Sequence, residues 1–131
     1  MEKENNIKIS VVIPTYNRKR ILLKVIYEYC NQSLDKNEFE IIIIDDGSYD
    51  QTYKFIREAM DTTDLRIHYF KQIHSGPAAA RNLGIRKANS ELILFTGDDI
   101  LPEKDLLKQH IMAHNVYSAD NVAILGYTTW S

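Results

Sequence analysis

The sequence predicts a single α/β domain over residues 1–131, built on a mostly parallel sheet flanked by helices. Two observations support this fold class. Apolar runs of strand length alternate along the chain with segments whose apolar residues recur at helical spacing, which is typical of a parallel sheet. Three of these runs also stop abruptly in polar clusters, as strands do when they end at a binding site. The clusters are Thr15-Tyr16-Asn17, Asp45-Asp46-Gly47-Ser48 and Thr96-Gly97-Asp98-Asp99.

The first elements follow directly from their apolar patterns. Residues 9–14 form an apolar run that predicts the first strand. A helix is expected over 18–31, because its apolar side chains fall on one face at helical spacing. Cys30 lies on that face, so we interpret it as a buried structural cysteine. Residues 41–44 are four isoleucines without polar alternation, which indicates a central strand covered by helices on both sides.

Three further elements are expected in the middle of the chain. Ser48 or Asp50 is expected to cap a second helix, which carries apolar residues from Tyr53 to Met60. Residues 66–71 alternate loosely between apolar and polar, which predicts a third strand towards the edge of the sheet. A capping serine, a glycine and a proline suited to a first helical turn then open a helix over 77–89.

The last part of the chain predicts a strand over 91–96, a helix over 102–115 with acidic residues in its first turn, and a fifth strand over 122–128. Fold rules favour a sheet in which the fourth strand and the second strand both lie beside the first, so that the topological switch falls between strands one and four. The polar ends of these strands would then face one another across one crevice.

Composition excludes several classes of partner. At 131 residues the chain can bury one core, and its net charge of -2 offers no basic excess to attract nucleic acid. No apolar stretch approaches the roughly 20 residues of a transmembrane segment, and the first six residues lack the apolar core of a signal peptide. We therefore expect a cytoplasmic protein, either free or peripheral to the inner membrane face.

The adjacent carboxylates of Asp98 and Asp99 are the first candidates for chemistry. Two such carboxylates repel each other unless a cation lies between them and a ligand. Mg²⁺ and Mn²⁺ prefer hard oxygen ligands and bind through one or two carboxylates plus substrate phosphates, so the pair suggests a metal-diphosphate site. An ordinary solvated turn is the alternative, and Asp45 to Ser48 alone fits a turn followed by a helix cap. The recurrence of polar clusters at three strand ends favours a functional site.

Other strand-end residues suit a nucleotide. Tyr16 could stack on a nucleobase, and because stacking tolerates any base, discrimination would need a hydrogen-bonding group such as Asp46. Arg81 lies in the segment that opens the helix from residue 77, where free amides favour an anion and a guanidinium could bind phosphate. The alternatives are that Tyr16 covers the edge of the core and that Arg81 is a surface arginine.

With these segments in this order, the chain resembles the first half of a family 2 glycosyltransferase with the Rossmann-like GT-A fold. The resemblance extends over nearly the whole chain. The motifs that carry it are Val11-Val12-Ile13-Pro14-Thr15-Tyr16-Asn17-Arg18, Ile43-Ile44-Asp45-Asp46-Gly47-Ser48, Gly76 to Asn82, and Phe95-Thr96-Gly97-Asp98-Asp99 followed by Pro102.

The resemblance implies an inverting transferase. The donor would be a nucleotide-diphosphate sugar, usually a uridine nucleotide, and the acceptor hydroxyl would belong to an unidentified glycan or lipid-linked glycan. Asp46 would read the base, Asp98 would contact the ribose or sugar, and Asp99 would hold Mn²⁺ or Mg²⁺, which would neutralise the departing diphosphate. The nucleotide-sugar-binding residues implied are Pro14, Thr15, Tyr16, Asp46, Arg81 and Asp98.

Two departures from the family pattern qualify this expectation. Gly97 stands where many relatives have an acidic residue, so the motif is Gly-Asp-Asp. Family members also continue beyond the length of this chain, which we therefore expect to be a donor-binding half without its acceptor half, with the catalytic base beyond Ser131. Such a half would bind a uridine diphosphate sugar with Mn²⁺ but transfer little of it.

The alternation of strands and helices with acidic strand ends also suits other classes of protein. A receiver domain places its acidic pair after the first strand and a lysine after the last, and this chain has neither arrangement. A nucleotidyltransferase normally has a glycine-rich loop after the first strand, and residues 15–20 contain no glycine. A non-catalytic nucleotide-sugar-binding module remains open on the sequence alone.

Overall fold

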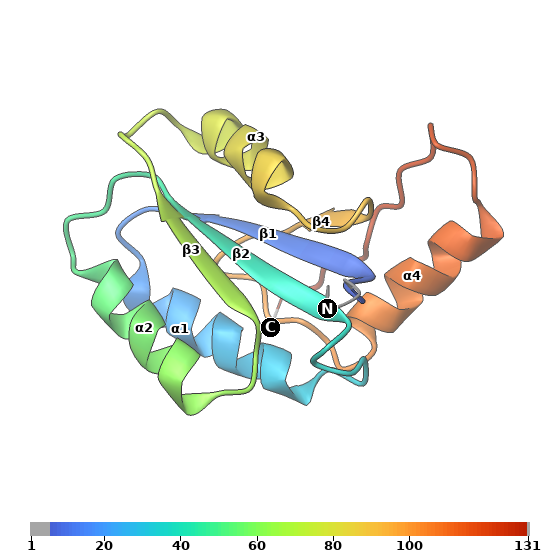
Figure 1. Cartoon of the computed structure of the whole chain (residues 1–131), viewed down its shortest axis with the longest axis horizontal. Helices are drawn as coiled ribbons and strands as arrows, with labels where there is room; N and C mark the ends of the chain where they lie inside the picture. Colours follow the sequence, from blue (N-terminus) through green and yellow to red (C-terminus); the bar gives the residue numbers. More distant parts are fainter. Residues whose placement is uncertain (1–5, 131) are drawn as a thin grey trace, which may run out of the picture.

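The structure is a computed structural model that describes residues 6–130. Strands and helices alternate through most of the chain (Figure 1). A short 3-10 turn, η1, follows the first helix. The elements are β1 (Ile9–Thr15), α1 (Lys19–Glu28), η1 (Tyr29–Asn31), β2 (Phe39–Asp45), α2 (Thr52–Thr62), β3 (Ile67–Lys71), α3 (Pro77–Lys87), β4 (Ile93–Phe95) and α4 (Leu106–Val116).

The sheet is parallel and has the order β3-β2-β1-β4. The predicted neighbours of the first strand are therefore confirmed, and so is the edge position of the third strand. Helices α1 and α2 cover one face of the sheet, and α3 covers the other (Figure 1). This arrangement confirms the expected α/β class.

The isoleucine run of β2 packs in both directions, as expected for a central strand. Ile41 and Ile43 belong to the larger core beneath α1 and α2, whereas Ile42 and Ile44 belong to the smaller core beneath α3. Successive side chains of a strand point to opposite faces, so burial on both faces favours apolar residues at consecutive positions, here Ile41 to Ile44. Continuous apolar character thus follows from the position of β2 in the sheet.

Helix α3 approaches the sheet closely at Gly84. A Cβ atom at this position would lie 2.3 Å from Cγ1 of Val12 on β1. Ala80, one turn earlier, is fully buried. The small residues of α3 therefore set the distance between the helix and the sheet.

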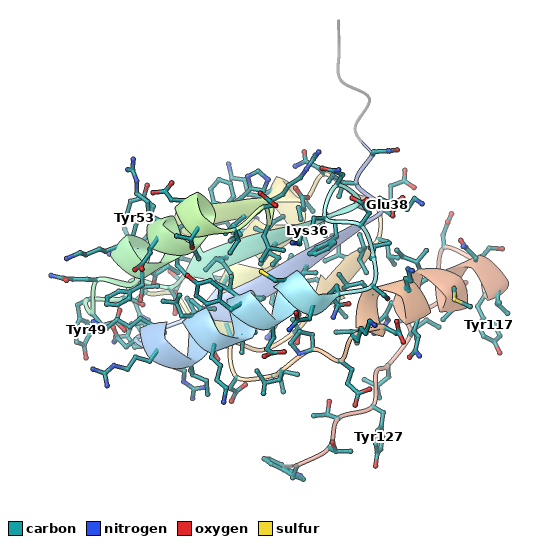
Figure 2. All side chains as sticks on the ribbon, turned by 90° about the horizontal axis from the view of Figure 1, so that it is seen from below. Lys36, Glu38, Tyr49, Tyr53, Tyr117 and Tyr127 are labelled. Atoms are coloured by element: carbon teal, nitrogen blue, oxygen red, sulfur yellow. The ribbon has the colours of Figure 1, made fainter. Side chains whose placement is uncertain are left out.

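The predicted fifth strand is wrong. Residues 122–128 have no regular secondary structure, and the side chains of Leu125 and Tyr127 are almost fully exposed. Figure 2 shows Tyr127 on a segment that extends away from the helices. The physical reason is that a strand needs a hydrogen-bonded neighbour, and among the described residues β4 pairs only with β1.

Helix boundaries also differ from the prediction where tertiary contacts compete for backbone groups. The last helix begins at Leu106 and not at 102, because the carbonyl groups of Glu103 and Lys104 accept hydrogen bonds from Gln32 Nε2 (2.5 Å) and Ser33 N (2.8 Å). The first helix ends at Glu28 and continues only as η1. Within η1, Cys30 is partly buried against the core, as interpreted from the sequence.

The predicted helix caps are likewise replaced. Helix α2 begins after Gln51, which has a left-handed conformation (φ 63°), and neither Ser48 nor Asp50 caps it. Their side chains instead bind the turn after β1, as described below. Helix α3 has Pro77 in its first turn, as predicted, but its N-cap residue is Gly76 and not Ser75. No helix of residues 6–130 is long and apolar enough to cross a membrane.

Candidate functional site

The ends of β1, β2 and β4 meet at one edge of the sheet. Thr15, the last residue of β1, accepts a backbone hydrogen bond from Asp46 N (2.9 Å) after β2. Its hydroxyl donates to Asp98 Oδ2 (3.0 Å) after β4. Thr15 therefore joins all three polar clusters that the sequence places at strand ends. These contacts bring the three separate segments together at one edge of the sheet.

The two carboxylates after β4 have different environments. Asp98 is only 7% exposed, and burial raises its pKa although the Thr15 hydroxyl and Arg18 act in the opposite direction. The side chain of Asp99 is 49% exposed. Arg18 Nη1 lies 3.3 Å from a carboxylate oxygen of each residue. The pair thus consists of a buried acid and an accessible acid, with one guanidinium facing both.

Asp46 anchors the loop between β3 and α3. Burial disfavours its charged form, but the hydrogen bonds that it accepts lower its pKa below the ordinary value. A carboxylate offers about four acceptor sites, so contacts from this loop use most of the acceptor sites of Asp46. The donors are Gln72 Nε2 (2.8 Å), Ser75 N (2.7 Å) and Gly76 N (3.0 Å), and His74 Nδ1 lies 2.9 Å from Oδ2.

Tyr16 belongs to a group of aromatic rings beside these strand ends. Its ring is 38% exposed and stacks on the ring of His74, with centroids 4.3 Å apart and planes inclined by 28°. Tyr49 meets the Tyr16 ring edge-on at 6.3 Å. His74 also contacts Asp46, so the predicted base-stacking residue and the predicted base-reading residue share His74 as a neighbour.

The turn after β1 is held in place by the loop after β2. Asn17 has a left-handed backbone (φ 52°), and its backbone N donates to Ser48 Oγ (2.8 Å). Its side-chain oxygen accepts from Tyr49 N (2.9 Å). Asp50 accepts from the backbone N of Lys19 (3.3 Å), which begins α1. These hydrogen bonds fix the backbone of the turn from which the side chains of Tyr16 and Arg18 extend.

Two predicted site residues take no part in this network. Pro14 is half-buried within β1, beside Ile44 of β2. Arg81 is exposed on α3, and the structure of residues 6–130 shows no hydrogen bond or ion pair for its side chain. Their predicted nucleotide contacts stay predictions.

Sequence reasoning missed roles for Arg18, Gln72 and His74. Arg18 and His74 lie within or beside the polar segments that were singled out, but neither was assigned a contact. A cation directly before a helix is unfavourable for the helix dipole, and this signal could have pointed to the acids that bind Arg18.

The acid pair fits a metal only if a ligand helps to hold it. No group of three or more His, Cys, Asp or Glu side chains within residues 6–130 is arranged to bind an ion. Asp99, however, offers hard carboxylate oxygens at the surface, and the Arg18 guanidinium shows that a positive group is accommodated there. Such a donor set suits Mg²⁺ or Mn²⁺ coordinated by one or two carboxylates, phosphates and water.

A hollow lies beside the loop that follows β2. Its volume is about 630 Å³, and Tyr69 donates a hydrogen bond from its hydroxyl to Asp45 in its wall. Figure 2 shows Tyr49 and Tyr53, two of its aromatic side chains, at the same end of the molecule. The lining residues are Asp45, Ser48, Tyr49, Gln51, Thr52, Tyr53, Tyr69 and Lys71.

Comparison with known proteins identifies a family model and relatives that match this chain. The model of the family described as glycosyl transferase family 2 matches residues 10–128. An uncharacterized glycosyltransferase of Rickettsia conorii is 40% identical over 126 residues, which cover 96% of this chain and 20% of the relative. The poly(ribitol-phosphate) beta-N-acetylglucosaminyltransferase TarS of Staphylococcus aureus is 31% identical over 101 residues, which cover 77% of this chain and 18% of TarS.

Two solved glycosyltransferase structures are similar to this chain. The crystal structure of Staphylococcus aureus TarS 1-349 in complex with UDP-GlcNAc has a TM-score of 0.74 and 28% identity, over 86% of this chain and 32% of that one. A mannosyltransferase from Pyrobaculum calidifontis in complex with GDP-Man and Mn²⁺ has a TM-score of 0.71 and 27% identity, over 76% of this chain and 30% of that one. The chain spans about a fifth of the length of the curated relatives described above.

Proposed function

Because the chain belongs to glycosyl transferase family 2, we propose that it binds the nucleotide-diphosphate sugar donor of a sugar transfer reaction. Its parallel sheet with flanking helices is the GT-A fold expected from the sequence. The observation that carries the proposal is the meeting of three strand ends through Thr15, which is bonded to Asp46 on one side and to Asp98 on the other.

A uridine nucleotide is the donor we propose. Support comes from the UDP-GlcNAc complex of TarS, since TarS is both a sequence relative and a structural neighbour. In this chain the ring of Tyr16 stacks on His74, and His74 in turn contacts the carboxylate of Asp46. A base stacked on Tyr16 would thus be within range of a carboxylate, provided that Asp46 exchanges one of its bonds to the 72–76 loop.

The diphosphate and sugar would lie towards Asp98 and Asp99. The buried Asp98 would bind the ribose or sugar, and the accessible Asp99 would bind Mn²⁺ or Mg²⁺ together with the phosphates. The metal would supply a positive charge that stabilises the departing diphosphate. Support for a metal comes from the Mn²⁺ in the mannosyltransferase neighbour. Arg81 would bind phosphate from the first turn of α3.

The reaction we propose is attack by an acceptor hydroxyl on the anomeric carbon with inversion. The hydroxyl proton would pass to a carboxylate base, and the diphosphate would leave with the electrons of the broken bond. We propose no base among residues 6–130, and we expect the 131-residue chain by itself to bind donor but to transfer little. A nucleotide-sugar-binding module without catalysis is the second candidate, because the contacts that join Thr15 to Asp46 and Asp98 account for donor binding alone.

Titration calorimetry of the 131-residue chain tests the proposal. We expect UDP to bind more tightly than GDP, and UDP binding to weaken when Mn²⁺ is replaced by a chelator. Asp99→Asn should remove this dependence on Mn²⁺, because it removes the charged metal ligand. The matched control is Asp61→Asn, which changes an exposed carboxylate on α2.

Two outcomes would contradict the proposal in different ways. If neither nucleotide binds, the donor-binding function is wrong. If UDP binds equally well with and without Mn²⁺, the metal is not part of the site. Sugar transfer by a longer form of the protein, to any acceptor, would exclude the non-catalytic candidate.

A further inference from the structure

The guanidinium of Arg18 faces both carboxylates of the acid pair. Its Nη1 atom is 3.3 Å from Asp98 Oδ1 and 3.3 Å from Asp99 Oδ2, so one nitrogen faces both carboxylates. The Arg18 side chain is 55% exposed. The guanidinium is therefore a positive group between two acids, held at the surface and free to move outwards.

The backbone does not favour a cation at this position. Arg18 is the N-cap residue of α1, and the positive end of a helix dipole disfavours a positive side chain. The preceding Asn17 is fixed by its bonds to the loop at residues 48–49, which sets the starting point of the Arg18 side chain. The attraction that keeps the guanidinium in place thus comes from the carboxylates.

A metal on Asp99 and the observed Arg18 compete for the same carboxylate charge. A metal–oxygen bond of about 2 Å to Asp99 Oδ2 would bring two positive charges close together beside that oxygen. The incoming ion must therefore displace the guanidinium. The long, exposed arginine side chain can make this movement without a change in the sheet.

We propose that Arg18 holds the place of the divalent cation in the nucleotide-free protein and yields it when metal and diphosphate bind. This inference rests on the proposed function, because it takes Asp99 as the metal ligand. In the absence of nucleotide, Arg18 neutralises the acid pair and weakens metal binding. When a diphosphate is present, its negative charge offers the displaced guanidinium another partner, so the metal and the nucleotide enter together.

Mn²⁺ binding to the nucleotide-free chain tests this inference directly. Free Mn²⁺ is measured by its electron paramagnetic resonance signal in titrations of the unsubstituted protein and of Arg18→Gln. We expect Arg18→Gln to bind Mn²⁺ about three- to tenfold more tightly, because a partly screened positive charge near the ion is removed. Arg20→Gln is the matched control, since Arg20 is an exposed cation of the same helix without a contact to the acid pair.

A second measurement detects weak binding. Binding to the folded state raises the unfolding temperature by mass action, so about 10 mM Mn²⁺ should stabilise Arg18→Gln more than the unsubstituted protein. In the Asp99→Asn background, Arg18→Gln should leave the response to Mn²⁺ unchanged. If Arg18 had only a structural role, Arg18→Gln would lower the unfolding temperature without raising the affinity of the protein for Mn²⁺.

The outcomes separate this inference from the proposed function. If Arg18→Gln binds Mn²⁺ no more tightly than the unsubstituted protein, while UDP binding still depends on Mn²⁺, the inference is overturned and the proposed function stands. An equal gain in Arg20→Gln would also overturn it, because the effect would then be one of net charge. If Mn²⁺ does not bind even with UDP, the inference and the proposed metal both fail.

Discussion

Glu40 is a buried carboxylate that connects three segments at the end of the sheet opposite the candidate site. It lies on β2 beside Ser10 of β1 and is 1% exposed. Ser10 Oγ donates to Oε2 (2.6 Å), and Asn89 donates to both oxygens, from its backbone N and its Nδ2 (2.8 Å each). His68 Nε2 lies 3.3 Å from Oε1. The network joins β1, β2 and β3 to the segment that follows α3.

Replacement of Glu40 by Gln should destabilise the fold by about 3 kcal/mol at neutral pH. Burial alone would raise the pKa of Glu40, but the donors from His68, Ser10 and Asn89 outweigh burial and lower it from 4.5 to about 2. Each pKa unit corresponds to about 1.4 kcal/mol, and the shift of the folded pKa below the unfolded pKa gives the magnitude. Gln also turns one acceptor into a donor that faces other donors.

Urea unfolding as a function of pH is the assay. Because the folded pKa lies below the unfolded one, the stabilisation by Glu40 is complete above pH 4.5 and is lost as the pH falls towards 2. The difference in free energy of unfolding between the unsubstituted protein and Glu40→Gln should therefore shrink as the pH falls from 4.5 towards 2. Glu38→Gln is the control, since its ion pair with Lys8 is partly exposed and such pairs contribute less than about 1 kcal/mol.

The predicted role of Glu40 is refuted if Glu40→Gln lowers the free energy of unfolding no more than Glu38→Gln does. It is also refuted if the free-energy difference stays constant between pH 4.5 and the acid end of the titration. In either case the hydrogen bonds to Glu40 would not stabilise its charged form.

Two further predictions concern stacking and packing. Tyr16→Ala should weaken UDP binding by about 1–3 kcal/mol in calorimetry through the loss of its ring, whereas Tyr16→Phe should keep most of the affinity; equal affinity of all three proteins would show that the base does not stack there. Gly84→Ala should lower the free energy of unfolding by about 1–3 kcal/mol, because the new Cβ would lie 2.3 Å from Cγ1 of Val12. Val12→Ala should relieve this clash, so the double variant should lose less stability than the two single variants added together, and strict additivity would contradict the packing argument.

Local sequence patterns contained much of the fold. The four isoleucines of β2 identified a central strand because burial on both faces favours an uninterrupted apolar run. The order of β1, β2 and β4 followed from rules for parallel sheets, and those rules brought the polar strand ends to one edge. Thr15, Tyr16, Asp46 and Asp98 could therefore be grouped before any contact was known.

Patterns failed where a residue's partner lies far away in the chain. Residues 122–128 have strand-like composition, but a strand also requires a neighbouring edge, which composition does not specify. Ser48 and Asp50 have the side chains of helix caps, yet they bind Asn17 and Lys19. Local propensity is a weak preference, and a tertiary hydrogen bond to a buried or fixed group can override it.

The amino-acid sequence by itself determined which segments are buried, their alternation, and the chemical nature of the groups at each strand end, because these properties depend on periodicity and residue type. Only the tertiary structure decided that Arg18 faces Asp98 and Asp99, and that Asp46 binds the loop before α3. These contacts join residues that are 29 to 81 positions apart. Their geometry exists only once the sheet has brought distant segments together, because the side chains involved are charged or polar and carry no periodic signal of their partners.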